Sequence, residues 1–279
     1  MELWFLTMNL GPFRNVVGIA PVQATNAHEA DLIEKFQRPL QCDYRVSHFL
    51  PAQYFQLVVK EFGFYLRRAD KQSNDPNDSR LPDVNLTEAA GMDQAMAPYL
   101  PTMVDPIVTQ ADYEEHRKRN YLHCWTDGWD ESKRLWREFG GNGTGVMLRS
   151  TTGMLRAHFQ HHDFLNINLV GCSYWPIHVA VPVKLGNLVA QCRKDERFIW
   201  QNETRLIAQL RDAAFVAKRG IDAQPPDGWW IGIRLHQVLS SIVLGPCMSY
   251  ADRDEVLSSL RKADLSSRIS PTVFAPEDF

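Results

Sequence analysis

Apolar residues recur at helical spacing in some segments of the chain and alternate with polar residues in others. In residues 52–67, Tyr54, Leu57, Val58 and Phe62 follow a helical period, which predicts an amphipathic helix that runs towards a strand. Asp130 opens another helical pattern that ends at Gly140, a residue suited to a helix C-terminus. The remaining predicted helices cover residues 28–40 (ended by Pro39), 110–119, 154–161 and 252–262.

Strand patterns are dispersed among these helices. Residues 203–210, ETRLIAQL, alternate polar and apolar side chains after an aromatic run. The other predicted strands cover residues 121–126, 145–149, 166–175, 178–185, 229–234 and 242–244. Because helices and strands are interspersed without a strict βαβα order, the sequence predicts an α+β fold. Its sheet should be mixed or mostly antiparallel, with flanking helices.

A polar insert interrupts this pattern. Residues 68–102 are rich in Asn, Asp and Pro, and a stretch of this length is typical of a lid, a binding loop or a disordered segment. We interpret it as an excursion within a single domain that covers residues 1–279, although a linker between two domains is an alternative. Within that domain we expect a core at 41–262, preceded by an extension at 1–40 and followed by a tail at 263–279.

Composition places the chain among ordinary globular proteins. Its 279 residues carry a net charge of −3, which excludes a strongly basic nucleic-acid-binding surface but not a local basic patch. Five scattered cysteines without a C-x-x-C pair indicate reduced thiols. No apolar run reaches the roughly 18–20 residues of a membrane span, and the N-terminus lacks a basic segment. We therefore expect a cytoplasmic protein with no membrane partner.

Three motifs resemble catalytic or binding motifs but have simpler interpretations. The glycine run at residues 140–145 follows a helix and precedes a strand, the reverse of a phosphate loop, and predicts a helix cap with a tight turn. His158, His161 and His162 lack the glutamate of H-E-x-x-H, so we expect no metal there; a metal-dependent hydrolase is the alternative. Cys124 and His123 should point to opposite faces of a strand, which predicts a buried, inert cysteine.

The segment Trp200-Gln201-Asn202-Glu203-Thr204-Arg205 carries the most suggestive chemistry. In a strand, Gln201 and Glu203 would share one face, with Arg205 beyond them. A carboxylate beside an amide can bind sugar hydroxyls and stabilise a developing oxocarbenium ion, as glycosidic bond cleavage requires. The alternative is an edge strand with a surface Glu–Arg pattern.

Tryptophans cluster in the middle of the chain. The spacing of Trp125, Trp129 and Trp136 indicates that most of them belong to the core. Trp125 stands next to Thr126 at a predicted strand end, where its ring could instead stack on a flat ligand.

Four segments, in order over about residues 40–262, together resemble one prokaryotic family. The first is Tyr44-Arg45 followed by a helix, Phe64-Tyr65-Leu66 and Asn74-Asp75-Pro76, and the second is Cys124-Trp125-Thr126, Glu131-Ser132, Leu135-Trp136 and the turn into residues 143–148. The third is Trp200 with Gln201-Asn202-Glu203-Thr204-Arg205, where an amide replaces the first acid of Glu-x-Glu-x-Arg. The fourth is Ile242-Val243-Leu244-Gly245-Pro246. The family is the domain of unknown function numbered twenty-nine seventy-one.

The order of polar residues in this pattern is also similar to that of ADP-ribosyltransferases, although the middle element has one Thr instead of a Ser-Thr-Ser run. The similarity implies that Tyr44, Arg45, Trp125 and Thr126 bind NAD, the substrate. Arg45 would hold its pyrophosphate or adenosine ribose and Thr126 its nicotinamide ribose. Glu203 would bind the ribose 2′-hydroxyl and stabilise the transition state, and Gln201 would orient the acceptor.

The resulting hypothesis is an ADP-ribosyltransferase-like enzyme that cleaves NAD and transfers ADP-ribose to an unidentified macromolecule, a protein or a nucleic acid. The resemblance associates such a protein with bacterial toxins and phage defence. A non-catalytic module that binds a nucleotide or a partner protein is the alternative. The enzyme hypothesis requires Arg45, Thr126 and Glu203 to lie within about 15 Å of one another, so that one substrate can touch all three.

Overall fold

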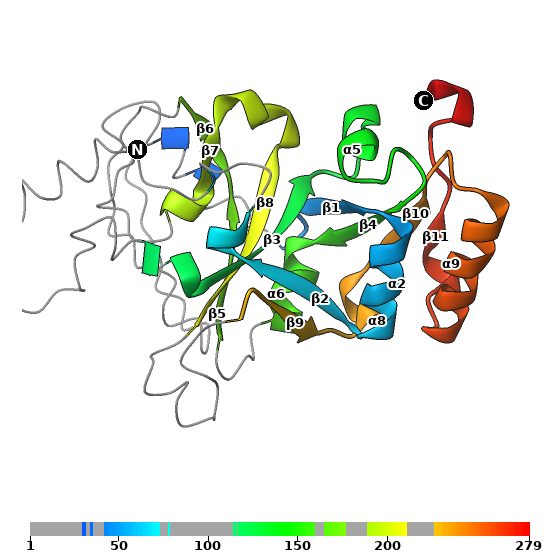
Figure 1. Cartoon of the computed structure of the whole chain (residues 1–279), viewed down its shortest axis with the longest axis horizontal. Coiled ribbons are helices and arrows are strands. Elements are labelled where there is room, and N and C mark those ends of the chain that lie inside the picture. Colours follow the sequence, from blue (N-terminus) through cyan, green and yellow to red (C-terminus); the bar gives the residue numbers. More distant parts are fainter. Residues whose placement is uncertain are drawn as a thin grey trace, which may run out of the picture.

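The computed structural model describes residues 30–31, 34–35, 42–72, 78, 114–115, 117–159, 165–176, 189–210 and 226–279. These residues form a nine-stranded sheet with helices on both of its faces, beside a small two-stranded sheet (Figure 1). The fold is α+β, as the dispersed helix and strand patterns predict. In this part of the chain, no helix is long and apolar enough to cross a bilayer.

The large sheet is mixed but mostly antiparallel. Its strands run in the order β11-β10-β4-β1-β3-β2-β9, and β8 pairs with β3 on one side and β5 on the other. The pair β10–β11 is parallel and the other pairs of this sheet are antiparallel. The strands are β1 (Arg45–Leu50), β2 (Gly63–Arg68), β3 (Asn120–Asp127), β4 (Val146–Thr151), β5 (Leu165–Gly171), β8 (Glu203–Leu210), β9 (Gly228–Gly232), β10 (Ser241–Leu244) and β11 (Ile269–Ser270).

The second sheet joins β6 (Ser173–Trp175) to β7 (Arg193–Asp195) in parallel. The described α-helices are α2 (Ala52–Lys60), α5 (Lys133–Glu138), α6 (Thr152–Phe159), α8 (Leu235–Val238) and α9 (Tyr250–Lys262). Short 3-10 helices are η2 (Ala69–Lys71), η4 (Val189–Cys192), η5 (Glu196–Gln201), η6 (Ser266–Arg268) and η7 (Pro276–Asp278).

Two apolar clusters cover opposite faces of the large sheet. The larger one joins buried residues of α2, α6, α8 and α9 to inward-facing strand residues such as Val46, Leu148 and Leu206. The smaller one packs Trp136 of α5 against Phe49, Met147 and Val243, with Phe139 and Trp200 at its margin. Alternate residues of β1 therefore serve different clusters, because successive side chains of a strand point to opposite faces.

The strand β3 divides one of its edges between two partners. At its C-terminal end Ser47 of β1 pairs with Thr126, whereas at its N-terminal end Arg67 of β2 pairs with Leu122. Its other edge is covered by β8 from Asn120 to Thr126. The sheet is therefore split between β1 and β2, and residues 123–125 of β3 have no strand partner on that edge.

Several predicted elements keep their type but change their bounds. The helix predicted over 52–67 is wrong beyond Lys60, where α2 ends. Phe62 turns the chain with a positive φ of 46°, and β2 begins at Gly63. A larger residue in place of Gly63 would put its Cβ 2.7 Å from the Ile231 carbonyl oxygen of β9. The strand predicted over 166–175 is broken at Cys172, whose N–H donates to the Glu203 carbonyl oxygen before the chain enters the second sheet.

The other strand predictions in the described chain are confirmed, and 203–210 matches β8 at both ends. Of the predicted helices at 28–40 and 110–119, only residues 30–31, 34–35, 114–115 and 117–119 are described, and all of these except Arg119, which lies in a turn, are helical. The strand predicted over 178–185 lies outside the described residues, as does nearly all of the polar insert.

Candidate functional site

A cavity of about 200 Å³ lies at the split in the sheet. Strand β1 contributes Ser47, His48 and Phe49, and β3 contributes Cys124, Trp125 and Thr126. The rest of the lining comes from β8, the segment before it and more distant parts of the chain. These residues are Gln72, Asp78, Phe139, Lys194, Phe198, Gln201 and Glu203.

Strand register explains why three of these residues meet. Ser47 pairs with Thr126, and Thr126 pairs with Glu203 on the other edge of β3. Residues directly opposite each other in antiparallel strands have their side chains on the same face. Ser47, Thr126 and Glu203 therefore form one row across β1, β3 and β8.

The split itself starts beside His48. After two paired residues, His48 and Trp125 no longer pair through their backbones, and His48 Nδ1 lies 2.8 Å from the Cys124 carbonyl oxygen. Because a carbonyl only accepts, Nδ1 carries the proton and Nε2 is left as an acceptor. Through this gap, His48 and Trp125 line the cavity although they belong to the opposite face of the sheet from Ser47 and Thr126.

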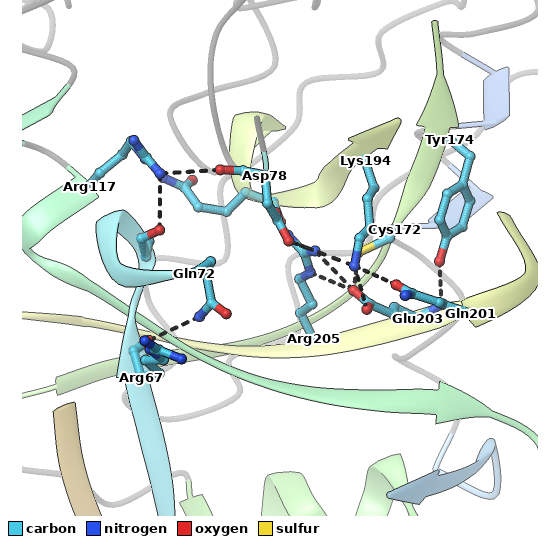
Figure 2. Close-up of polar contacts among 12 residues, drawn as sticks. Arg67, Gln72, Asp78, Arg117, Cys172, Tyr174, Lys194, Gln201, Glu203 and Arg205 are labelled. Carbon is cyan, nitrogen blue, oxygen red and sulfur yellow. Dashed lines mark hydrogen bonds and ion pairs between the residues drawn. The ribbon is translucent and has the colours of Figure 1, made fainter. Parts of the chain in front are cut away.

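A buried network of charges forms one wall of the cavity. Lys194 Nζ donates to Glu203 Oε1 at 2.8 Å and also to the Gln201 side-chain oxygen. Arg205 holds the other carboxylate oxygen, with Nε 3.0 Å and Nη2 2.9 Å from Glu203 Oε2. Figure 2 shows that the two cations approach the carboxylate of Glu203 from different sides, so that its orientation is fixed.

Asp78 completes this network from the polar insert. Its two carboxylate oxygens each accept a 2.7 Å hydrogen bond from Arg205, in a bidentate pair (Figure 2). Its backbone carbonyl oxygen accepts from Arg117 Nη2 at 3.2 Å. Two carboxylates thus face two cations, and the side chains of all four are at most 8% exposed.

The network keeps Glu203 ionised. Burial alone would raise the pKa of its carboxyl group, but the charges and hydrogen bonds of Arg205 and Lys194 outweigh burial and lower the pKa to about 2. The backbone N–H of Glu203 donates to the Tyr174 hydroxyl at 2.6 Å, which anchors the start of β8. Glu203 is therefore a permanent anion at neutral pH and does not act as a general acid.

The other side chains at the cavity are neutral. Burial lowers the pKa of His48 to about 4, and burial together with the charge of His48 lowers the pKa of the neighbouring His123, which does not line the cavity, well below its ordinary value. Burial raises the pKa of Cys124 to about 12, so this thiol stays protonated. Phe49, Phe139 and Phe198 add aromatic surface to the cavity lining.

Four of the six residues expected at the site line this cavity: Trp125, Thr126, Gln201 and Glu203. Tyr44 and Arg45 do not. The Tyr44 hydroxyl donates to Asp127 at 2.8 Å, and the Arg45 guanidinium lies 4.7 Å from the ring centre of Trp129. From the register and the usual strand spacings, the Cα of Arg45 is about 12 Å from that of Glu203. Arg45 thus lies beside the cavity and outside it.

The expectation that Gln201 and Glu203 share one strand face is wrong. Gln201 ends the 3-10 helix η5, Asn202 turns the chain with a positive φ of 40°, and the strand starts only at Glu203. The two side chains meet because Lys194 binds both. The alternative of an edge strand is also wrong, since β8 lies between β3 and β5.

Sequence reasoning missed Asp78, Lys194, Ser47 and His48 as site residues. A signal was available for Asp78, which follows the quoted Asn74-Asp75-Pro76 by two residues. Lys194 stands in the charged run 193–197, which resembles a solvated surface segment. Its burial depends on β7 and η5, which local spacing does not reveal.

The simpler interpretations of the other motifs can be compared with the structure. The glycine run connects α5 to β4, with Gly141, Asn142 and Gly143 at positive φ, as expected of a cap and turn. His158 Nε2 lies 3.3 Å from the Gly232 carbonyl oxygen, and His161 and His162 lie outside the described residues. Trp125 and Trp136 are both buried in the core, and Trp125 also lines the cavity.

Comparisons of the chain with protein-family models, curated proteins and solved structures find no match. The resemblance to family twenty-nine seventy-one stays a prediction.

Proposed function

We propose that the cavity binds one end of NAD and that the protein is an ADP-ribosyltransferase-like enzyme. The observation that carries this proposal is a buried carboxylate, Glu203, held ionised and fixed in orientation at the wall of a cavity that Thr126 and Trp125 also line. Ligand cavities of whole drug-sized molecules span ~300–1,000 Å³, so about 200 Å³ suits one ring and its sugar.

Glu203 fits the electrostatic role in glycosidic cleavage. Glu203 Oε2 already accepts from Arg205 Nε and Nη2 and from Cys172 Sγ, whereas Oε1 accepts from Lys194 alone among the described residues. Because a carboxylate oxygen has about two lone-pair positions, Oε1 can still accept a ribose hydroxyl. As the bond to nicotinamide lengthens, positive charge develops on the ribose, and a fixed anion that needs no reorganisation stabilises it. The departing nicotinamide needs no proton, which agrees with a site whose carboxylate cannot supply one.

Neighbouring residues would divide the remaining tasks. Thr126, in the same row as Glu203, is placed to hydrogen-bond the sugar, and Gln201 keeps its amide N–H groups as donors while its oxygen binds Lys194. Arg45, about 12 Å away and outside the cavity, suits the pyrophosphate of a dinucleotide that extends out of it. The same proposal includes a protein or a nucleic acid as the acceptor of ADP-ribose and a role in toxin or phage-defence systems.

One observation favours the non-catalytic alternative. The four charges of Asp78, Lys194, Glu203 and Arg205 already neutralise one another, as they would if the network only anchored the polar insert to the sheet. In that case the cavity would bind a nucleotide or a partner without chemistry.

The test is nicotinamide release from NAD by the wild type and by Glu203→Gln, with cell lysate as the source of acceptor. Removing one charge from the buried network is itself expected to cost about 3 kcal/mol of stability, so activity is measured per folded molecule, below the melting transition. Release by the wild type and a loss of about 100-fold or more in kcat for the variant would support the enzyme.

Glu131→Gln is the matched control. The side chain of Glu131 is also buried and accepts hydrogen bonds from Trp136, Thr272 and Val273, but it does not line the cavity. This variant should lose stability and keep its activity per folded molecule. The proposal fails if the wild type releases no nicotinamide and NAD does not shift its Tm, or if Glu203→Gln stays as active as the control.

A further inference from the structure

Lys194 contacts both Gln201 and Glu203 from a separate strand. It stands in β7, whereas Gln201 ends η5 and Glu203 begins β8, so one side chain spans the turn between the 3-10 helix and the strand. Its Nζ donates to the side-chain oxygen of Gln201 and, at 2.8 Å, to Glu203 Oε1 (Figure 2). Both acceptors line the cavity, so a single ammonium group holds two of its lining residues.

These bonds decide which way the Gln201 amide faces. An ammonium group only donates, so the atom that it contacts is the carbonyl oxygen of the amide, and the amide nitrogen points elsewhere. Among the described residues that nitrogen has no hydrogen-bond partner, and it is not one of the unpartnered polar atoms that are sealed from solvent. Because Gln201 is 5% exposed and lines the cavity, a partner for its N–H groups can enter through the cavity.

Lys194 itself has little capacity left for a ligand. Besides its bonds to Gln201 and Glu203, its Nζ lies 3.7 Å from Asp78 Oδ2. Three oxygens thus surround an ammonium group that has three N–H donors, and the side chain is 8% exposed. Any influence of Lys194 on a ligand must therefore pass through its partners.

Charge balance alone does not explain the bond to Gln201. An amide is neutral, so it contributes nothing to the pairing of Lys194 and Arg205 with Glu203 and Asp78. A buried amide that is bonded at one end and unpartnered at the other is unusual in a folded protein, unless a ligand pairs the second end.

We propose that Lys194 is a positioning residue that fixes the Gln201 amide with its N–H groups towards the ligand in the cavity. The oxygens of Gln201 and Glu203 bind the same nitrogen, which keeps them within about 6 Å of each other. Lys194 thereby holds an amide donor close to Glu203 Oε1, an acceptor. A donor near an acceptor suits a ribose, whose hydroxyl groups both accept and donate.

The inference rests on the proposed function in assigning these two groups to the ribose of NAD. The fixed amide, however, can be observed in the protein without a ligand. The experiment therefore has one arm that needs no NAD and one that does.

The first arm is NMR relaxation of the Gln201 side-chain NH₂ group in the ligand-free protein. Its signal is identified as the one that is lost in Gln201→Met, a variant that keeps all four charges of the network. The order parameter of this group should be about 0.8 in the wild type and should fall below about 0.6 in Lys194→Met. A mobile NH₂ group in the wild type, or a fixed one in Lys194→Met, would overturn the proposal.

The second arm is calorimetric titration of NAD into the wild type, Lys194→Met, Gln201→Met and the double variant. Each single variant should weaken binding by about fivefold or more, because each removes the oriented donor. In the double variant, Lys194→Met should add less than about twofold to the effect of Gln201→Met, since no amide is left to orient. Equal effects of Lys194→Met with and without the amide, or undiminished binding by Gln201→Met, would overturn the proposal.

Lys133→Met and Glu131→Gln are the controls. Lys133 Nζ also lies 2.8 Å from a carboxylate oxygen, that of Asp278, and Glu131→Gln is expected to lose stability, but neither residue lines the cavity. Both variants should keep the Gln201 NH₂ group fixed and bind NAD as the wild type does. A loss of the fixed NH₂ signal in Glu131→Gln would show that general destabilisation releases the amide, and would overturn the proposal.

The two arms separate this inference from the proposed function. If the amide is fixed by Lys194 but the wild type neither binds nor cleaves NAD, the positioning role is upheld and the proposed function is refuted. If the wild type cleaves NAD and Gln201→Met binds and cleaves it equally well, the proposed function survives and this inference is overturned. The wild-type signal and Gln201→Met decide the matter even if Lys194→Met does not fold.

Discussion

Lowering the pH from 7 to 5 should destabilise the protein through two buried histidines at the split in the sheet. The rings of His48 and His123 lie 4.3 Å apart, and Phe64 and Trp125 surround them. Burial lowers the pKa of His48 to about 4 and that of His123 well below its ordinary value of 6.5. Both rings are therefore neutral in the folded protein at pH 5, whereas the same histidines are protonated in the unfolded chain.

The sign and the magnitude follow from proton linkage. A group with a depressed pKa in the folded state binds protons mainly after unfolding, so its stability contribution is complete above about pH 6.5 and falls as the pH drops towards 4. At pH 5, which is about 1.5 units below the unfolded pKa, His48 alone should cost about 2 kcal/mol, and His123 should add to this loss in the same direction. Such a loss is a large part of the ~5–15 kcal/mol that stabilises a typical domain.

Urea unfolding at constant ionic strength, followed by tryptophan fluorescence at pH 7 and pH 5, measures this difference. The comparison is a double variant, His48→Gln with His123→Phe. A glutamine amide can still donate to the Cys124 carbonyl oxygen, and a phenylalanine can still pack against Phe64. The loss between the two pH values should fall from at least about 2 kcal/mol to below about 1 kcal/mol. A double variant that loses as much stability as the wild type would refute this reasoning. Glu203 does not interfere, because its stabilising contribution is complete above about pH 4.5 and is lost only as the pH falls from there towards its folded pKa of about 2.

Two further predictions concern stability. Asp78→Asn breaks a buried bidentate pair and leaves Arg205 short of a counter-charge, so the free energy of unfolding in urea should fall by about 3 kcal/mol. The control Asp70→Asn removes a more exposed carboxylate and should lower the free energy of unfolding clearly less. Equal losses for the two variants would contradict the conclusion that burial makes the Asp78–Arg205 pair important for stability. Gly145→Ala would place a Cβ 2.2 Å from the Leu50 carbonyl oxygen, and should cost about 3 kcal/mol or more. If the Tm of this variant equals that of the wild type, the close approach of Leu50 to Gly145 is contradicted.

Local pattern was sufficient for much of the fold and for half of the site. Residues 203–210 alternate clearly and form β8, which carries Glu203 to the cavity. Trp125 and Thr126 could be chosen because they end a recognisable strand. Asp78 could not be chosen, because it is 127 residues from its partner Arg205 along the chain and pairing over such a distance leaves no periodic trace.

Errors arose where one residue changes the direction of the backbone. Asn202 adopts a left-handed conformation and separates Gln201 from the strand that its sequence seemed to continue. Phe62 does the same between α2 and β2, although a bulky residue rarely takes positive φ and gives no warning of a turn. His48 shows a third limit, since its importance comes from the Cys124 carbonyl oxygen and not from its own neighbours in sequence.

The position of β8 has a consequence for synthesis of the protein. This strand lies between β3 and β5, yet it follows both in the chain, so two earlier strands leave the ribosome before the strand that joins them exists (Figure 1). Until residue 210 has emerged, β3 and β5 have open edges that chaperones or other nascent chains can bind. Because the same strand brings Glu203, no shorter nascent chain can hold a finished site, although β9, β10 and β11 join the sheet later still.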